Sequence, residues 1–257
     1  MLRRLIVTCV LVATATIAAP AAAEEPRSPL LDSTLVRLEP GDSGPDVERM
    51  QRALTDAGFY HFEIDGVFGP GTETAVVALH KFLKIDRTST FHALDWLRLS
   101  QLPDPGLPNR WNELDYIEVD IARQLLFLVR GGVVTQILPV STGSGNTYWS
   151  VRNNRWAGSR TPRGDYTLDM HQYGWACDSV TGWCVYKYWG FTPFYGVHGY
   201  RSVPAYPASH GCVRVTLADA DWLEPHLFLG MPIHVWDKPP YIPPPPGIGP
   251  AMVIPPE

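Results

Sequence analysis

The stretch that decides the assignment of the fold is residues 197–214, which read VHGYRSVPAYPASHGCVR. It holds one cysteine, Cys212, with His210 two positions before it and His198 fourteen positions before it. A free thiol is only about 3% thiolate at neutral pH, so a nucleophilic cysteine needs a base or a cationic neighbour. His210 shares a face with Cys212 if the segment is extended, and folding can bring His198 to the sulfur. The residues alone therefore leave the base open.

The glycine beside Cys212 favours acyl transfer. Gly211 allows the backbone to bend so that its N–H groups can converge on a developing oxyanion. Arg214 lies two positions beyond the cysteine and offers a guanidinium on the same face. The competing interpretation is that the histidines only satisfy hydrogen bonds, with Arg214 in a surface ion pair.

The first 23 residues have the pattern of a secretory signal. Arg3 and Arg4 precede an apolar run over residues 5–19, and an Ala-x-Ala site ends at Ala23. The run is shorter than the ~20 apolar residues that span a bilayer. We therefore expect an exported protein, cleaved after Ala23, with no transmembrane anchor after cleavage. The net charge of −5 becomes more negative when the arginines leave, which disfavours nucleic acid as a partner.

Export determines how the cysteines are interpreted. Cys9 leaves with the signal, so Cys177, Cys184 and Cys212 remain, and an odd number leaves one thiol free. A disulfide between Cys177 and Cys184 would close a short loop and stabilise it by about 2.5 kcal/mol. A zinc site with His171 is the alternative, but neither cysteine belongs to a Cys-x-x-Cys pair. We therefore expect the disulfide and no metal.

Proline-dense segments divide the chain. The expected order is a signal peptide (1–23), a leader (24–37), a helical domain (38–100), a linker (101–113), a catalytic domain (114–237) and a proline-rich tail (238–257).

The periodicity of apolar residues differs between the two domains. In the first, near-helical spacing from Val47 to Ala57 and from Ala75 to Leu83, with a weaker pattern over residues 90–99, predicts a three-helix bundle. After the linker, alternating and continuous apolar runs predict strands, which are expected at 116–120, 125–129, 133–140, 165–170, 185–188 and 232–236. One helix is expected at 217–223, and the arginine-rich segment 144–164 is expected to be a solvated loop.

Two resemblances give these domains a family. The run from Gly41 to Ile85, with the turn sequence DGVFG at 65–69, resembles the peptidoglycan-binding domain attached to many wall enzymes. The segments 197–199 and 209–214, with PVSTG at 139–143 and TPRG at 161–164, resemble the signature of the YkuD-type L,D-transpeptidases. The implied fold has two domains, a small all-α peptidoglycan-binding bundle followed by a mainly-β catalytic domain.

The second resemblance also implies roles for single residues. Cys212 is the nucleophile and His198 the general base, while His210 and Gly211 shape the turn and the oxyanion site. Substrate binding is expected from four further positions, Ser209, Arg214, Gly199 and Tyr200. Tyr200 departs from the family pattern, in which a small hydroxyl residue often follows His-Gly. No cofactor is implied.

The implied reaction is acyl transfer on peptidoglycan stem peptides, part of cell-wall biogenesis and the control of cell shape. A Cys212 thioester would form with loss of the terminal D-alanine of a tetrapeptide, and a neighbouring stem would resolve it into a 3-3 cross-link. Carbapenems are the expected covalent inhibitors. The alternatives are an L,D-carboxypeptidase or amide hydrolase, in which water resolves the thioester, and a non-catalytic protein that only binds the wall.

Overall fold

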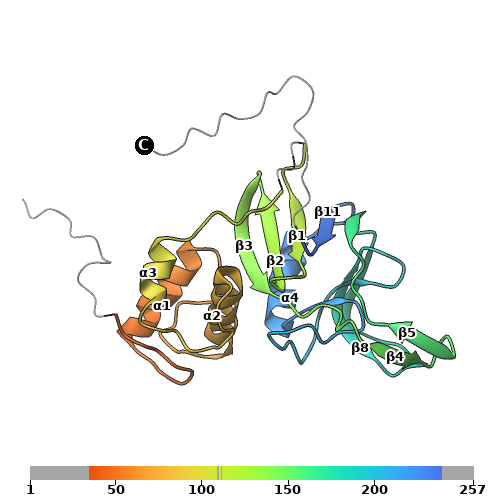
Figure 1. The fold of residues 1–257 in the computed structure, drawn as a ribbon, viewed down its shortest axis with the longest axis horizontal. Coiled ribbons are helices and arrows are strands. Elements are labelled where there is room, and N and C mark those ends of the chain that lie inside the picture. The colour runs from red at the N-terminus through yellow and green to blue at the C-terminus, as the bar shows by residue number, and fades with distance from the viewer. Residues whose placement is uncertain (1–34, 109, 111, 239–257) are drawn as a thin grey trace, which may run out of the picture. The chain divides into compact units, whose positions relative to one another are not determined.

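The computed structural model describes residues 35–108, 110 and 112–238. The expected signal peptide, the leader up to residue 34 and the tail from residue 239 lie outside the described residues. Figure 1 shows the helices α1 to α3 in orange to yellow, and the strands that follow in green to blue.

Helix α1 (Pro45–Asp56) starts at a glycine-proline pair. Gly44 has φ +115°, and Pro45 occupies the first helical position, where the N–H that proline lacks would have no helical partner. Val47, Met50 and Leu54 are buried along one face, as their spacing predicted. The first helix therefore begins and buries its apolar residues where the sequence indicated.

A buried glutamine fixes the connection from α1 to α2 (Pro70–Leu83). The Nε2 of Gln51 donates to Asp65 Oδ1 at 2.8 Å and to Thr72 Oγ1 at 3.1 Å, and its Oε1 accepts the Gly66 N–H at 2.9 Å. A buried amide costs little free energy when both of its ends are hydrogen-bonded. Gln51 thus holds the turn at residues 65–69 against the first helix.

Helix α3 (Asp95–Ser100) is shorter than the range 90–99 that the sequence suggested. Phe91 exchanges two backbone hydrogen bonds of 2.9 Å with Leu38, and the Asp95 carboxylate accepts the His92 N–H at 2.7 Å. The residues before Asp95 therefore form a bridge and a cap. The predicted helical domain with three helices is confirmed, with this change at the third.

The catalytic region contains a five-stranded sheet in the order β3-β2-β1-β11-β6. Its strands are β1 (Tyr116–Asp120), β2 (Leu125–Arg130), β3 (Val133–Pro139), β6 (Gly164–Thr167) and β11 (Pro232–Trp236). Strand β1 pairs antiparallel with β2 and parallel with β11. The last strand of the region therefore lies beside the first.

A second sheet has the order β10-β9-β8-β7. Its strands are β7 (Met170–Cys177), β8 (Cys184–Gly190), β9 (Gly196–Gly199) and β10 (Val213–Val215), followed by helix α4 (Leu217–Leu223) and the short 3-10 helix η1 (Glu224–His226). The mainly-β architecture is the predicted one.

Residues 144–164 differ from the expected solvated loop. Strands β4 (Thr147–Ser150) and β5 (Arg155–Gly158) form a hairpin in which Trp149 and Trp156 are cross-strand partners with ring centroids 5.8 Å apart. Asn154 in the turn has φ +48°, a conformation that asparagine tolerates. Cross-strand aromatic pairs stabilise antiparallel ladders, which explains why this segment is ordered.

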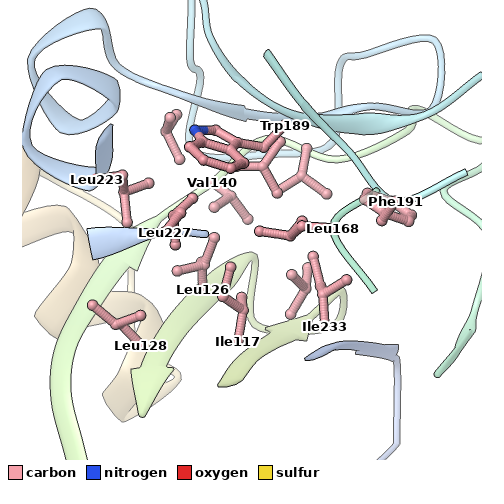
Figure 2. Close-up of a cluster of buried hydrophobic side chains, with 14 of the residues drawn as sticks. Ile117, Leu126, Leu128, Val140, Leu168, Trp189, Phe191, Leu223, Leu227 and Ile233 are labelled. Atoms are coloured by element: carbon pink, nitrogen blue, oxygen red, sulfur yellow. The ribbon is translucent and has the colours of Figure 1, made fainter. Parts of the chain in front are cut away.

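Strand β2 is buried on both faces, which explains its continuous apolar run. Leu126 and Leu128 belong to the cluster that also contains Trp189 of β8 (Figure 2). Leu125 and Phe127 alternate with them and belong to a second cluster, which they share with buried residues of α1 and α2. Helices α1 and α2 thus cover one face of the five-stranded sheet.

Candidate active site

Two neighbouring strands bring His198 and Cys212 together. Strands β9 and β10 are parallel, with His198 in register with Arg214, and Cys212 directly precedes β10. Both residues line one cavity of about 970 Å³. The two residues, which are fourteen positions apart in the sequence, therefore lie on the wall of the same cavity.

His198 is held in one tautomer by a backbone carbonyl. Its Nδ1 lies 2.9 Å from the oxygen of Gly199, which can only accept, so Nδ1 carries the proton and Nε2 is the basic nitrogen. Burial lowers the pKa of His198 to about 4, and Arg214 acts in the same direction. The imidazole is therefore neutral at physiological pH and able to accept a proton.

Cys212 is a free cysteine, which forms no disulfide. Burial raises the pKa of the thiol above its usual value, while a backbone hydrogen bond from Gly196 and the charge of Arg214 partly oppose this. A sulfur in this environment must lose its proton as it attacks, so it depends on a base. One cavity therefore contains a thiol with a raised pKa and an imidazole with a lowered pKa.

The turn before Cys212 is closed by Ser209. The Ser209 hydroxyl donates to the Cys212 carbonyl at 2.6 Å and accepts the Gly211 N–H at 3.0 Å. Gly211 has φ +135°, and a Cβ there would lie 2.3 Å from Cε1 of Tyr195, so this position requires glycine. The hydroxyl proton of Ser209 is thus used within the turn. Gly211 can shape the oxyanion site through the bend of its backbone, but its own N–H group is already bonded to Ser209.

The segment 139–143 is hydrogen-bonded to the chain at the start of that turn. The Thr142 carbonyl accepts the N–H groups of Ala208 and Ser209, both at 2.9 Å. The side-chain amide of Gln124 donates to Thr142 Oγ1 at 2.6 Å and accepts the Thr142 N–H at 2.8 Å. Sequence reasoning missed Gln124, because nothing in its local pattern shows which distant segment its amide reaches.

His210 lies between two aromatic rings. The centroid of Tyr148, on β4, is 4.3 Å from that of the imidazole, and Trp183 stacks at 4.4 Å with an interplanar angle of 6°. Burial lowers the pKa of His210. All three rings line the cavity, so His210 forms part of its wall. Tyr148 was not foreseen, because the segment that carries it was expected to be a loop.

Of the remaining predicted residues, Arg214 and Tyr200 line the cavity and Gly199 does not. The guanidinium of Arg214 lies 4.1 Å from the centroid of the Tyr200 ring, in a cation–π contact. A Cβ at Gly199 would lie 2.9 Å from the Cβ of Ala220, so the glycine admits helix α4. Gly199 therefore contributes its carbonyl to His198 and space to the helix.

The disulfide between Cys177 and Cys184 is present, as the parity of the cysteines predicted. It closes the tip of the β7–β8 hairpin, in which Trp183 contacts His210. Asp178 in the same loop forms an ion pair with Arg152, which lies between β4 and β5. This loop therefore connects the β4–β5 hairpin to the wall of the cavity.

We expect the double substitution Cys177→Ser and Cys184→Ser to lower the free energy of unfolding by up to about 2.5 kcal/mol, because the unfolded chain regains the entropy of the loop. Thermal unfolding of the variant, and of the wild type with and without reductant, measures this change. An unaltered melting temperature in both the variant and the reduced wild type would show that the bridge does not stabilise the fold.

Within residues 35–108, 110 and 112–238, no group of three or more His, Cys, Asp or Glu side chains is arranged to hold a metal ion. In the same part of the chain, no helix has both the length and the apolar character needed to cross a membrane.

Two family models match the chain. The L,D-transpeptidase catalytic domain matches residues 114–235, and the peptidoglycan binding domain matches residues 43–88. The comparison with curated proteins gives no significant match.

Solved structures give a further match. The crystal structure of the L,D-transpeptidase (residues 123–326) from Xylanimonas cellulosilytica DSM 15894 is 32% identical, covers 77% of this chain and 97% of its own, and has a TM-score of 0.70. An L,D-transpeptidase from Stackebrandtia nassauensis is 19% identical over 79% of this chain and 96% of its own, but its TM-score of 0.47 is too low to support an argument. The matched domain and the first of these structures show that the chain belongs to the L,D-transpeptidase family, with a peptidoglycan-binding domain before the catalytic domain.

Proposed function

We propose that this protein is a cysteine-dependent L,D-transpeptidase that forms 3-3 cross-links in peptidoglycan. His198 Nε2 takes the proton of the Cys212 thiol as the sulfur attacks the carbonyl of the third residue of a tetrapeptide stem. The tetrahedral intermediate collapses to a thioester, and the C–N bond to the terminal D-alanine breaks. His198 returns its proton to the leaving amine.

The second step transfers the acyl group to a neighbouring stem. The side-chain amine of its diamino acid attacks the thioester carbonyl, His198 accepts the amine proton, and the sulfur leaves and is reprotonated. The observation that carries this proposal is the neutral imidazole of His198, with Nδ1 held by Gly199 and Nε2 basic, in the cavity that contains Cys212.

The proposed substrate also determines where the protein would act and what its helical domain would bind. Peptidoglycan lies outside the cytoplasm, so the proposed substrate is consistent with the export that residues 1–23 predict. The helical domain would hold the glycan or stem peptides of the same polymer, and the enzyme would act in cell-wall biogenesis and cell shape.

Incubation of the purified protein with tetrapeptide muropeptides, followed by mass spectrometry of the products, tests the function. We expect free D-alanine together with tripeptide-tetrapeptide dimers. Tripeptide without dimer would instead assign an L,D-carboxypeptidase, and unchanged muropeptides would leave the non-catalytic, wall-binding interpretation.

A further inference from the structure

A lysine of the helical domain is buried against the catalytic region. Lys81, on α2, is 1% exposed, and its Nζ donates to the carbonyls of Val140 at 2.9 Å and Gln124 at 3.2 Å. Among the described residues it forms no ion pair, and burial lowers its pKa to about 7. Because burying an ammonium without a counter-ion is unfavourable, an apolar side chain would serve better if packing were the only requirement.

The two residues whose carbonyls Lys81 binds are connected by hydrogen bonds to the turn that precedes Cys212. Gln124 has φ +60°, and its carbonyl also accepts the Val140 N–H at 2.9 Å, so Lys81 Nζ binds two residues that are already hydrogen-bonded to each other. The side chain of Gln124 holds Thr142, whose carbonyl accepts the N–H of Ser209. Ser209 in turn is hydrogen-bonded to the carbonyl of Cys212. Hydrogen bonds between successive residues thus connect Lys81 to the backbone carbonyl of Cys212.

A second residue of the helical domain, His61, contacts helix α4, which follows Cys212 in the chain. His61 Nε2 lies 2.8 Å from Asp219 Oδ1, and the His61 ring stacks on Trp222 with centroids 4.7 Å apart. Asp219 is in the first turn of α4, where its backbone N–H and its carboxylate both bond to the N-cap residue Thr216. Helix α4 follows β10 and therefore fixes the chain directly after Cys212.

From these two independent contacts we infer that the helical domain is a structural part of the active site, in which Lys81 and His61 are positioning residues for Cys212. Lys81 supports the turn through residues 140–142, and His61 supports helix α4. Neither residue needs to touch substrate. The inference rests on the proposed function for one point, namely that the affected reaction is transpeptidation. The positioning of Cys212 is independent of that function, because it can be measured with a simple thiol reagent.

The test compares Lys81→Met with the matched control Lys84→Met in the full chain. Methionine keeps the length and apolar stem of Lys81 but removes its donors, whereas Lys84 is exposed at the end of the same helix. Two rates are measured per reactive site, namely acylation by imipenem and alkylation of Cys212 by iodoacetamide, each followed by mass spectrometry. Thermal unfolding is recorded for each variant.

We expect Lys81→Met to lower the maximal acylation rate and the alkylation rate about ten-fold, because a small displacement of a catalytic group costs one to two orders of magnitude. The half-saturating imipenem concentration should change less than two-fold, and Lys84→Met should match the wild type. A purely structural role for Lys81 would lower the melting temperature and the number of reactive sites but not the rate per site.

A folded Lys81→Met variant whose rates per site stay within two-fold of the control would overturn the inference. If that variant does not fold, His61→Phe decides by the same criterion, since phenylalanine keeps the stack on Trp222 and removes the bond to Asp219; a three-fold loss is expected. If imipenem does not acylate the wild type, the proposed function fails, and the iodoacetamide rates alone then decide the positioning.

Discussion

Replacing Cys212 with alanine should abolish both the release of D-alanine and the formation of cross-linked dimers. Loss of a nucleophile that acts together with its base costs about 10⁶-fold in rate, which places the residual activity below detection. The measurement is chromatographic analysis of muropeptides after prolonged incubation with equal amounts of folded wild type and variant.

The control for this experiment is a measurement that shows the variant to be folded. Cys212 forms no disulfide, so its replacement should leave the unfolding transition cooperative and shift the melting temperature by only a few degrees. Activity of Cys212→Ala above about 1% of the wild-type rate would show that another group carries the acyl intermediate.

Replacing His198 with glutamine should change the pH dependence of the reaction as well as its rate. In the wild type, the pKa of His198 near 4 leaves the base free at all higher pH values, so the rate of acylation should be flat from about pH 5.5 to 8. The rate should fall only when His198 becomes protonated, as the pH approaches 4 from above.

Without the base, only the thiolate can react. Because the pKa of Cys212 is raised above its usual value, the thiolate fraction is small and increases ten-fold for each pH unit. The rate of His198→Gln should therefore rise ten-fold per unit over the range in which the wild type is flat, and lie about 10²- to 10⁴-fold lower at pH 7. Stopped-flow acylation by imipenem measures both profiles, and parallel profiles would exclude His198 as the base.

Local patterns were sufficient for much of the fold. The strand at 232–236 and the helix at 217–223 were predicted with the bounds that the structure has, because each is a short apolar or capped segment with clear ends. The hairpin at 144–164 was missed because its stability comes from the cross-strand pair of Trp149 and Trp156, and register between strands is not a local property. The same limit applies to α3, where pairing of Phe91 with Leu38 replaced the expected first turn.

The candidate site divides in the same way. The disulfide was predictable, because the parity of the cysteines and the pattern of a secretory signal can both be read from the sequence. The residues alone left open whether His198 or His210 is the base. The proposal of His198 depends on two contacts that the sequence does not reveal, the Gly199 carbonyl at Nδ1 of His198 and the aromatic stack around His210. The roles of Lys81 and Gln124 could not be predicted, since Lys81 binds carbonyls 43 and 59 positions away and the Gln124 amide reaches Thr142, 18 positions away.

The intact mass of the protein after exposure to imipenem tests whether Cys212 is the nucleophile of an acyltransferase. Wild type should gain the mass of one imipenem, located by peptide mapping at Cys212, and Cys212→Ala should gain none. A wild type without an adduct, or an adduct undiminished on Cys212→Ala, would contradict the account.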